Sequence, residues 1–588
     1  MQTRKSIFLI LTIIAGIFLL QHHLYYQPLL SQGDHGRDLY AAQMTLKGAV
    51  PYRDYWWVYG PLMPYYYALF FKIFGINIKS VLLGKLVLNL LSGIFFFLIL
   101  SPLIPPLFVF AGTLWFLLYN LDFFFTYNHV GGITCLMAIV YCLFLYMRSK
   151  NKKYLYPGLV LIFILSLIKV NFGLVALFLF LLTIFIHDEI YEIPFTRQKG
   201  ILVLTAAFGL PLLVFLIYSF LFHGYPEYVV RQCLPYLKGD QPYEASIGQT
   251  LWAWWQAIAL NINNSWPNRF FAIILISSIT QVFYNIYTNK FEKPFKHEII
   301  FAIGIFVAFY IFNLHEYLVS GVIYRAFWSQ PFSIMMIFLF LGAATHHYSK
   351  YIKLLVTIIL FTLYVFYLHE YLSPFLNGFP LLFWIMVIPI SLVIGLYFYP
   401  QLLRFLLVFV LFTIIFFRYQ EQIEIVKAKK LPEQYLALER GQIITGNEWG
   451  WFATVEQTTE FLQTHLKKDE TFFALPYDVL YYYLTDKPSP SRQLIFFEHI
   501  KIPPEQEHSV VSEIEKKNVN YILLSNRIAS GEPGLGVLGK TYCPILGEYI
   551  RDNFQPIAMF GDWVDHPGWA WSHGTQILKR IDRSAKIQ

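Results

Sequence analysis

The sequence predicts a polytopic α-helical membrane protein with about 13 transmembrane helices, followed by a soluble α/β domain at the C-terminus. Hydrophobic residues make up 57% of the 588-residue chain and charged residues only 14%. Apolar runs of about 18 to 22 residues recur, each long enough to cross a hydrocarbon core about 30 Å thick. Charged residues and prolines become frequent only after about Arg418. These observations place lipid around the first part of the chain and water around the last.

The apolar runs define the individual spans. The first is expected to be a retained N-terminal span, because no small-residue cleavage site follows it. We expect boundaries accurate to about four residues. The spans are predicted at 6–24, 78–100, 103–121, 131–147, 154–169, 171–187, 200–222, 268–288, 298–314, 324–344, 353–372, 379–398 and 402–417.

The distribution of basic residues orients these spans. Cytoplasmic connections are enriched in Lys and Arg. With the N-terminus inside, every predicted inner segment except the tight Pro105/Pro106 turn is basic, and the clusters are Arg4/Lys5, Arg148/Lys150/Lys152/Lys153, Arg197/Lys199, Lys290/Lys293/Lys296, Lys350/Lys353 and Arg404. The formal net charge of +8 is therefore explained by topology and headgroup contact, which argues against nucleic acid as a partner. An odd number of spans places the C-terminal domain outside.

The outer connections are long, aromatic and acidic. In the first, residues 25–77, the stretch from Asp38 to Leu46 predicts a short amphipathic helix and Pro61 to Phe74 a second, and we expect both to lie in the membrane interface. The second long outer loop covers about 223–267. Residues 1–420 thus form the membrane domain.

Residues 421–588 predict a small α/β domain. Helices are expected at VEQTTEFLQTHLKK and SVVSEIEKKNV, and strands at TFFALP, NYILLSN, PIAMFG and TQILKR. No glycine-rich phosphate loop opens either helix. Of the four cysteines, Cys135 and Cys142 share one span as packing residues, and a Cys233–Cys543 bridge is an unfavoured alternative.

The first outer loop carries three acids, Asp34, Asp38 and Asp54. A carboxylate at the mouth of a helical bundle can be partly desolvated, which raises its basicity and suits it to accept a proton. The alternative is that these are solvated loop acids. Their context, GDHGRDLYAAQMTLKGAVPYRDYWWVYGPLMPYYYALFFKIFG, resembles the first-loop signature of bacterial GT-C glycosyltransferases, the superfamily of protein O-mannosyltransferases and lipid A aminoarabinose transferases.

In that superfamily an acidic pair follows the first span, and the loop continues through a short helix to a PYRD-like segment and a GP turn. Asp34 matches the first acid, whereas His35 stands at the second position. Asp38, one helical turn further on, can take the place of the missing acid. The incomplete pair weakens the case for a carboxylate-bound metal, and a divalent metal stays an open alternative.

The resemblance covers about residues 1–420 and implies further site residues on the same side of the membrane. Asp122 lies at an outer helix end where the superfamily often has an acidic or polar group, and His129 follows it. Lys169 resembles a position that bears Lys or Arg. Arg231 and Arg325 are outer-side cations suited to phosphate. The alternatives are a solvated helix end for Asp122, snorkelling to the interface for Lys169, and ordinary interface anchoring for the two arginines. Candidate catalytic residues are thus Asp34, Asp38 and Asp122, and candidate substrate- or phosphate-binding residues are Asp54, Tyr59, His129, Lys169, Arg231 and Arg325.

The implied activity is transfer of a sugar from a polyprenyl-phosphate donor to a lipid, polysaccharide or protein acceptor at the outer face of the cytoplasmic membrane, with inversion. Tyr55, Trp56, Trp57 and Tyr59 would line the sugar site or form an interface belt. Two alternatives are a transporter or flippase for a lipid-linked glycan, and a polymerase or ligase. The clustering of acids at one face and the lack of internal repeats disfavour a transporter.

Overall fold

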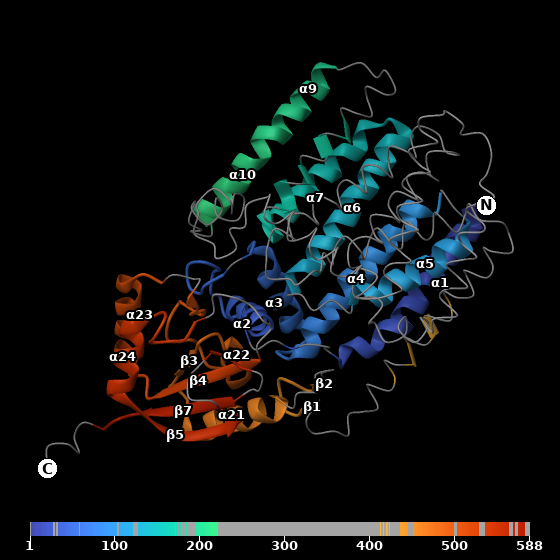
Figure 1. Ribbon diagram of the computed structural model, residues 1–588. Helices are drawn as coiled ribbons and strands as arrows, with labels where there is room; N and C mark the ends of the chain where they lie inside the picture. Colours follow the sequence, from blue (N-terminus) through green and yellow to red (C-terminus); the bar gives the residue numbers. More distant parts are fainter. Residues whose placement is uncertain are drawn as a thin grey trace, which may run out of the picture.

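The computed structural model describes residues 2–221 and 435–582, apart from short internal gaps, and a few positions between 412 and 423 (Figure 1). Four helical segments in these residues are long and apolar enough to cross a membrane, namely Lys5–Leu24, Ile78–Leu100, Val130–Ser149 and Arg197–Phe220. The spans predicted from 268 to 417 lie outside the described residues, except for a few positions after 411. The span predicted at 171–187 is only partly described.

The described helices of the bundle follow the predicted spans closely. They are α1 (Gln2–Leu20), α4 (Ile78–Leu100), α5 (Pro106–Leu121), α6 (Tyr127–Ser149) and α7 (Leu155–Ile168), and then α9 (Arg197–Leu204) and α10 (Leu210–Leu216). A π-helical turn joins α9 to α10, and a second one extends this long helix beyond α10. Buried polar groups pair across helices: Asn89 donates to the Leu117 carbonyl at 3.1 Å, and the Ser92 and Thr134 hydroxyls lie 2.9 Å apart. Such pairing is required where water is excluded.

The outward faces of the bundle are apolar. Ile14 on α1 is 59% exposed, and Phe208 and Phe220 on the α9–α10 helix are 72% and 73% exposed. A helix in water would bury such side chains or place polar residues there.

Two helices of the first loop, α2 (Asp34–Leu46) and α3 (Leu62–Phe74), lie between the bundle and the C-terminal domain (Figure 1). Every residue of α2 from His35 to Gln43 is buried by protein, and the expectation that this helix lies in the membrane interface stays a prediction. Helix α2 also begins four residues earlier than predicted. It packs on α3 on one side and on a helix of the C-terminal domain on the other, so both of its faces are covered by protein.

The C-terminal domain is the predicted α/β unit. Its sheet has the order β3-β4-β7-β5, with β3 (Phe472–Leu475) parallel to β4 (Tyr521–Ile528), and with β7 (Gly574–Arg580) antiparallel to both β4 and β5 (Phe554–Gly561). A short strand β6 (Gly568–Ala570) pairs with the end of β4. A separate ribbon joins β1 (Tyr435–Leu436) to β2 (Ile443–Ile444).

Alternate residues of β3 face two different cores, as the period of a strand requires. Phe473 and Leu475 pack beneath α23 (Pro504–Lys516) and α24 (Pro544–Asn553). Phe472 and Ala474 face the core shared with α21 (Trp451–His465), α22 (Val479–Thr485) and the first-loop helices. The strand is therefore buried on both faces, and the membrane-proximal core is continuous from α2 to the sheet.

A set of polar contacts fastens the C-terminal domain to the first loop. Asp486, which ends α22 in a left-handed conformation, accepts from Gln43 at 2.5 Å and from Lys47 at 2.8 Å. The backbone N–H of Ser489 donates to the Tyr40 hydroxyl at 2.9 Å. These contacts hold the C-terminal half of α2, so the domain helps to fix the position of the helix that carries Asp34.

Gly36 allows the closest approach between α2 and α22. A Cβ there would lie 2.4 Å from the backbone nitrogen of Leu480 and 2.7 Å from its Cα, and backbone cannot move aside cheaply. We expect Gly36→Ala to separate the two helices at a cost of about 1–3 kcal/mol and to make the C-terminal domain sensitive to limited trypsin digestion. Gly132→Ala is the matched control, since its nearest neighbour lies at 3.5 Å. Equal protease resistance of both variants would contradict the prediction.

Candidate functional site

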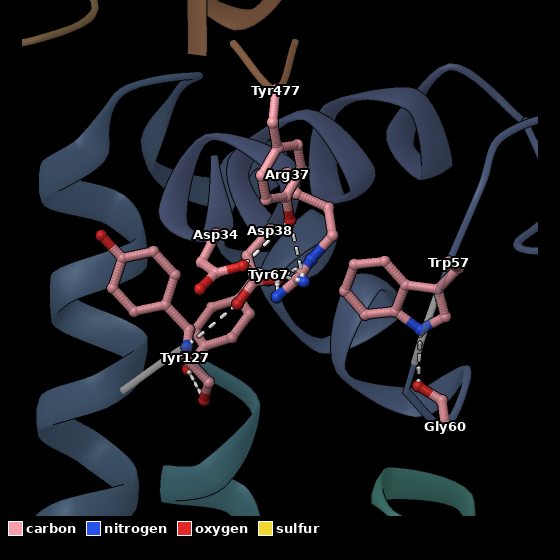
Figure 2. Close-up of polar contacts among 8 residues, drawn as sticks. All are labelled: Asp34, Arg37, Asp38, Trp57, Gly60, Tyr67, Tyr127 and Tyr477. Atoms are coloured by element: carbon pink, nitrogen blue, oxygen red, sulfur yellow. Dashed lines mark hydrogen bonds and ion pairs between the residues drawn. The ribbon is translucent and has the colours of Figure 1, made fainter. Parts of the chain in front are cut away.

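The first turn of α2 holds two of the predicted acids around one arginine (Figure 2). Arg37 donates to Oδ1 of Asp38 from Nε at 3.1 Å and from Nη2 at 2.9 Å, and to Oδ1 of Asp34 from Nη1 at 3.2 Å. The spacing of three and four residues brings Asp34 to the same side of the helix as Arg37 and Asp38. Sequence reasoning named both acids and missed the arginine between them.

Asp38 is the inner acid, and both of its oxygens accept hydrogen bonds from the protein. Its Oδ2 accepts the backbone N–H of Tyr127, the first residue of α6, at 3.0 Å. A carboxylate is favourable at that end of a helix because the first N–H groups have no intrahelical acceptor. Burial raises the pKa of Asp38 to about 6, against the opposing effect of Arg37. Asp38 thus joins α2 to α6 and is placed to support the site, with no oxygen facing a substrate.

The raised pKa of Asp38 predicts a pH-dependent contribution to stability. Between about pH 4 and pH 6 the carboxyl ionises more readily in the unfolded chain than in the folded protein. Its contribution to the free energy of unfolding therefore falls as the pH rises through this window. We expect the melting temperature of the wild type, relative to Asp38→Asn, to be higher at pH 4.5 than at pH 7.5 in scanning fluorimetry of the detergent-solubilised protein. A difference that grows with pH would contradict this.

Asp34 is the outer acid and differs from Asp38 in its surroundings. Its side chain is 53% exposed, whereas that of Asp38 is 2% exposed. Its Oδ1 accepts from Arg37 and also from the hydroxyl of Tyr477, at 2.9 Å, a residue of the C-terminal domain. One oxygen is therefore anchored, and the carboxyl group borders solvent. Of the two acids, only Asp34 can meet a molecule that enters from outside.

His35 occupies the position of the missing second acid and lies inside the protein. Its ring contacts that of Tyr127 edge to face, with centroids 5.1 Å apart, and it is almost completely buried. Burial lowers the pKa of His35 to about 3. The imidazole is therefore neutral at physiological pH, and the second negative charge of the site comes from Asp38.

Tyr59 connects the acids to a predicted cation. The guanidinium of Arg37 lies 4.8 Å from the Tyr59 ring centroid, and Nζ of Lys169 lies 5.9 Å from the same centroid. Lys169 also lies 4.2 Å from the ring of Phe172. Cations at these distances are attracted to aromatic rings. Asp34, Tyr59 and Lys169, which sequence reasoning proposed separately, therefore belong to one cluster.

The turn at Gly60 sets the position of Tyr59 against Lys169. The Gly60 N–H donates to the carbonyl of Ile168 at 2.8 Å, and the Trp57 indole donates to the Gly60 carbonyl at 2.9 Å. Ile168 is the last residue of α7, and Lys169 follows in an extended conformation. A Cβ on Gly60 would lie 2.1 Å from the Leu167 carbonyl oxygen, so only glycine fits this approach.

Some of the remaining predicted residues have contacts away from this cluster, and the others lie outside the described part of the chain. Asp54 pairs with Arg53 at 2.7 Å and accepts the Val50 N–H, both within its own exposed turn. Tyr55 and Trp57 are buried core residues, whereas Trp56 and Tyr59 are half-buried. His129 belongs to α6, but its side chain is not described, and Asp122, Arg231 and Arg325 lie outside the described residues.

In the described part of the chain, no group of three or more His, Cys, Asp or Glu side chains is arranged to hold a metal ion. The two acids of α2 are instead bridged by a guanidinium, so no step is assigned to a metal. No protein-family model matches the chain, and no curated protein matches it. The geometry of the site therefore carries the functional argument.

Two residues of the site could not be found from the sequence. Arg37 lies between the acids in GDHGRD but has the appearance of an ordinary loop cation. Tyr477 is separated from Asp34 by 443 positions and reaches it only because the C-terminal domain docks on α2. A polar residue just after a buried strand is a weak signal, which the TFFALP pattern places directly before Tyr477.

Proposed function

We propose that the protein is an integral-membrane glycosyltransferase that moves a sugar from a polyprenyl-phosphate donor to an acceptor at the outer face of the cytoplasmic membrane. The observation that carries the proposal is the cluster in which the half-exposed carboxyl of Asp34 is held by Arg37 and Lys169 lies across the Tyr59 ring. An acid open to solvent and a nearby cation are what this transfer requires.

The membrane setting rests on the apolar segments and on their exposed surfaces. Four described helices have the length and composition of spans, and the α9–α10 helix exposes phenylalanines. We propose about 13 spans, with the N-terminus inside and the first loop and the C-terminal domain outside, on the basis of the alternating Lys and Arg clusters. The contacts between α2 and α22 require that loop and domain share one side.

The chemistry follows from the different environments of the two acids. Asp34 takes the proton from the acceptor nucleophile, which attacks the anomeric carbon as the bond to the phosphate oxygen breaks. The proton then passes from Asp34 to water. A single displacement inverts the anomeric configuration. Arg37 and Asp38 do not react in this scheme. They hold α2 against α6 and keep Asp34 oriented, because every nitrogen of Arg37 donates to a protein acceptor.

The leaving group is a phosphate monoester that must be stabilised as its charge develops. Lys169 is the described cation best suited to this task, since Arg37 is already neutralised by two carboxylates. We propose that Arg231 and Arg325, from later outer segments, add to it. Half-buried Tyr59 and Trp56 offer apolar faces for the sugar ring.

A transporter or flippase for a lipid-linked glycan is the second candidate. It would also bind a polyprenyl-phosphate sugar with Lys169 and the aromatic residues. It would not need a half-exposed acid that two donors hold in a fixed orientation. That feature favours the transferase.

The two functions are separated by following a bound donor. The purified protein in lipid nanodiscs is loaded with polyprenyl-phosphate glucose, galactose, mannose and arabinose in turn, and native mass spectrometry records which one stays bound. Membranes of the cells that naturally make the protein are then added as the acceptor source. We expect the bound donor to be converted to polyprenyl phosphate as sugar appears on the acceptor. Binding followed by release of intact donor would instead indicate transport.

A further inference from the structure

Tyr477 brings a hydroxyl from the C-terminal domain into contact with the membrane-domain acid. It accepts from Nη1 of Arg37 at 3.0 Å and donates to Oδ1 of Asp34 at 2.9 Å, so that three residues form a closed triangle of hydrogen bonds (Figure 2). Burial raises the pKa of Tyr477 well above its ordinary value. The hydroxyl therefore keeps its proton, and its hydrogen is available to Asp34.

The position of Tyr477 is fixed from within the C-terminal domain. It lies two residues after the end of β3 and two residues before the start of α22. Its ring packs edge to face on Phe497, with centroids 5.8 Å apart, and the next residue, Asp478, accepts a hydrogen bond from Ser525 on β4. The close packing of Gly36 on Leu480 holds the same segment on α2. The hydroxyl is thus presented to Asp34 by a rigid, docked domain.

We propose that Tyr477 is a positioning residue for Asp34, and that the C-terminal domain is thereby a working part of the transferase site. This inference rests on the proposed function. Two donors on Oδ1 limit the rotation of the carboxyl group and so fix the direction in which it meets the acceptor. Arg37 alone would not suffice, since its Nη1 contact is the longer one and its other nitrogens serve Asp38.

The test is Tyr477→Phe in the full-length protein, assayed with a polyprenyl-phosphate sugar from the panel above and membranes of the native cells as acceptor. We expect kcat to fall about 10- to 100-fold with KM for the donor within about threefold, the pattern of an interaction used in the transition state. Tyr483→Phe is the matched control, because its hydroxyl makes only a 3.5 Å contact with the Arg440 carbonyl. It is expected to retain the wild-type rate.

The pH dependence gives a second readout that general loosening of the domain would not move. Asp34 is faced by Arg37, Asp38 and His35 on its own helix and by Tyr477 from the C-terminal domain. Loss of a donor disfavours the ionised carboxylate. The acidic limb of the kcat profile is therefore expected to move to higher pH in Tyr477→Phe and to stay in place in Tyr483→Phe.

The outcomes distinguish this inference from the proposed function. Transfer by the wild type with an unchanged kcat and pH profile in Tyr477→Phe would overturn the positioning role alone. Tyr477→Phe is also added to Asp34→Asn. If it lowers kcat there by the same factor as in the wild type, its effect is a general structural one, and the positioning role is again overturned. Absence of any transfer by the wild type would refute the proposed function, and the positioning role with it. Rates are referred to the folded fraction measured by size-exclusion chromatography, so that poor folding is not counted as lost catalysis.

Discussion

Replacement of Asp34 by Asn is expected to lower sugar transfer about 10³-fold while leaving the amount of folded protein unchanged. General-base catalysis contributes about 10²- to 10⁴-fold, and an amide cannot accept the proton. Folding should tolerate the change because the side chain is half exposed and the amide carbonyl can still accept from Arg37 and Tyr477. The measurement is the initial rate of polyprenyl phosphate release, with protein level checked by immunoblot.

Substitutions of two other aspartates serve as controls for this result. Asp469→Asn changes an exposed acid in a turn of the C-terminal domain and should leave the rate unchanged. Asp54→Asn alters a turn whose carboxylate pairs with Arg53, and we expect a loss of less than about 10-fold. If Asp54→Asn lost more activity than Asp34→Asn, the base would have to be reassigned to the PYRD segment.

Replacement of Arg37 by Gln is expected to have the largest effect on stability. It would leave the buried Asp38 carboxylate without its main partner, and breaking a buried ion pair costs about 3–5 kcal/mol. It would also release Asp34 and Tyr477 from their shared contact. We expect little monodisperse protein in detergent and a clearly lowered melting temperature in the fraction that folds.

The double variant Arg37→Met with Asp38→Asn separates folding from catalysis at this position. It removes both buried charges, while the amide introduced by Asp38→Asn keeps an acceptor for the Tyr127 N–H. Replacing a buried ion pair with uncharged residues of similar size is often neutral for stability. We expect the double variant to recover most of the folded yield and almost none of the transfer activity. Recovery of activity together with yield would show that the arginine serves folding alone.

The helices of the bundle could be predicted because apolar length is a local property. The predicted span at 78–100 coincides with α4, and the one at 154–169 ends within a residue of α7. The strands of the C-terminal domain were found for a similar reason, since TFFALP and NYILLSN are buried apolar runs. The short helices α22 and α24 were missed. With seven and ten residues, these helices are too short for an apolar period to stand out from the neighbouring sequence.

The site was only partly predictable, because tertiary contacts determine how its residues are arranged in space. Asp34 and Tyr59 were proposed from the first loop and Lys169 from a later helix end, but their common cluster depends on the Gly60 turn against the end of α7. The sequence also did not indicate that the C-terminal domain covers the second face of α2. Composition cannot distinguish an amphipathic helix on lipid from one that another domain covers.

The most direct test of the central claim is sugar transfer by the purified protein in liposomes. A radiolabelled polyprenyl-phosphate sugar from the panel is supplied with membranes of the native cells, and wild type and Asp34→Asn are compared at equal folded protein. We predict stoichiometric release of polyprenyl phosphate with label in the acceptor for the wild type, and about 10³-fold less for Asp34→Asn. Equal rates for the two proteins, or label that crosses the bilayer still attached to its lipid, would contradict the assignment.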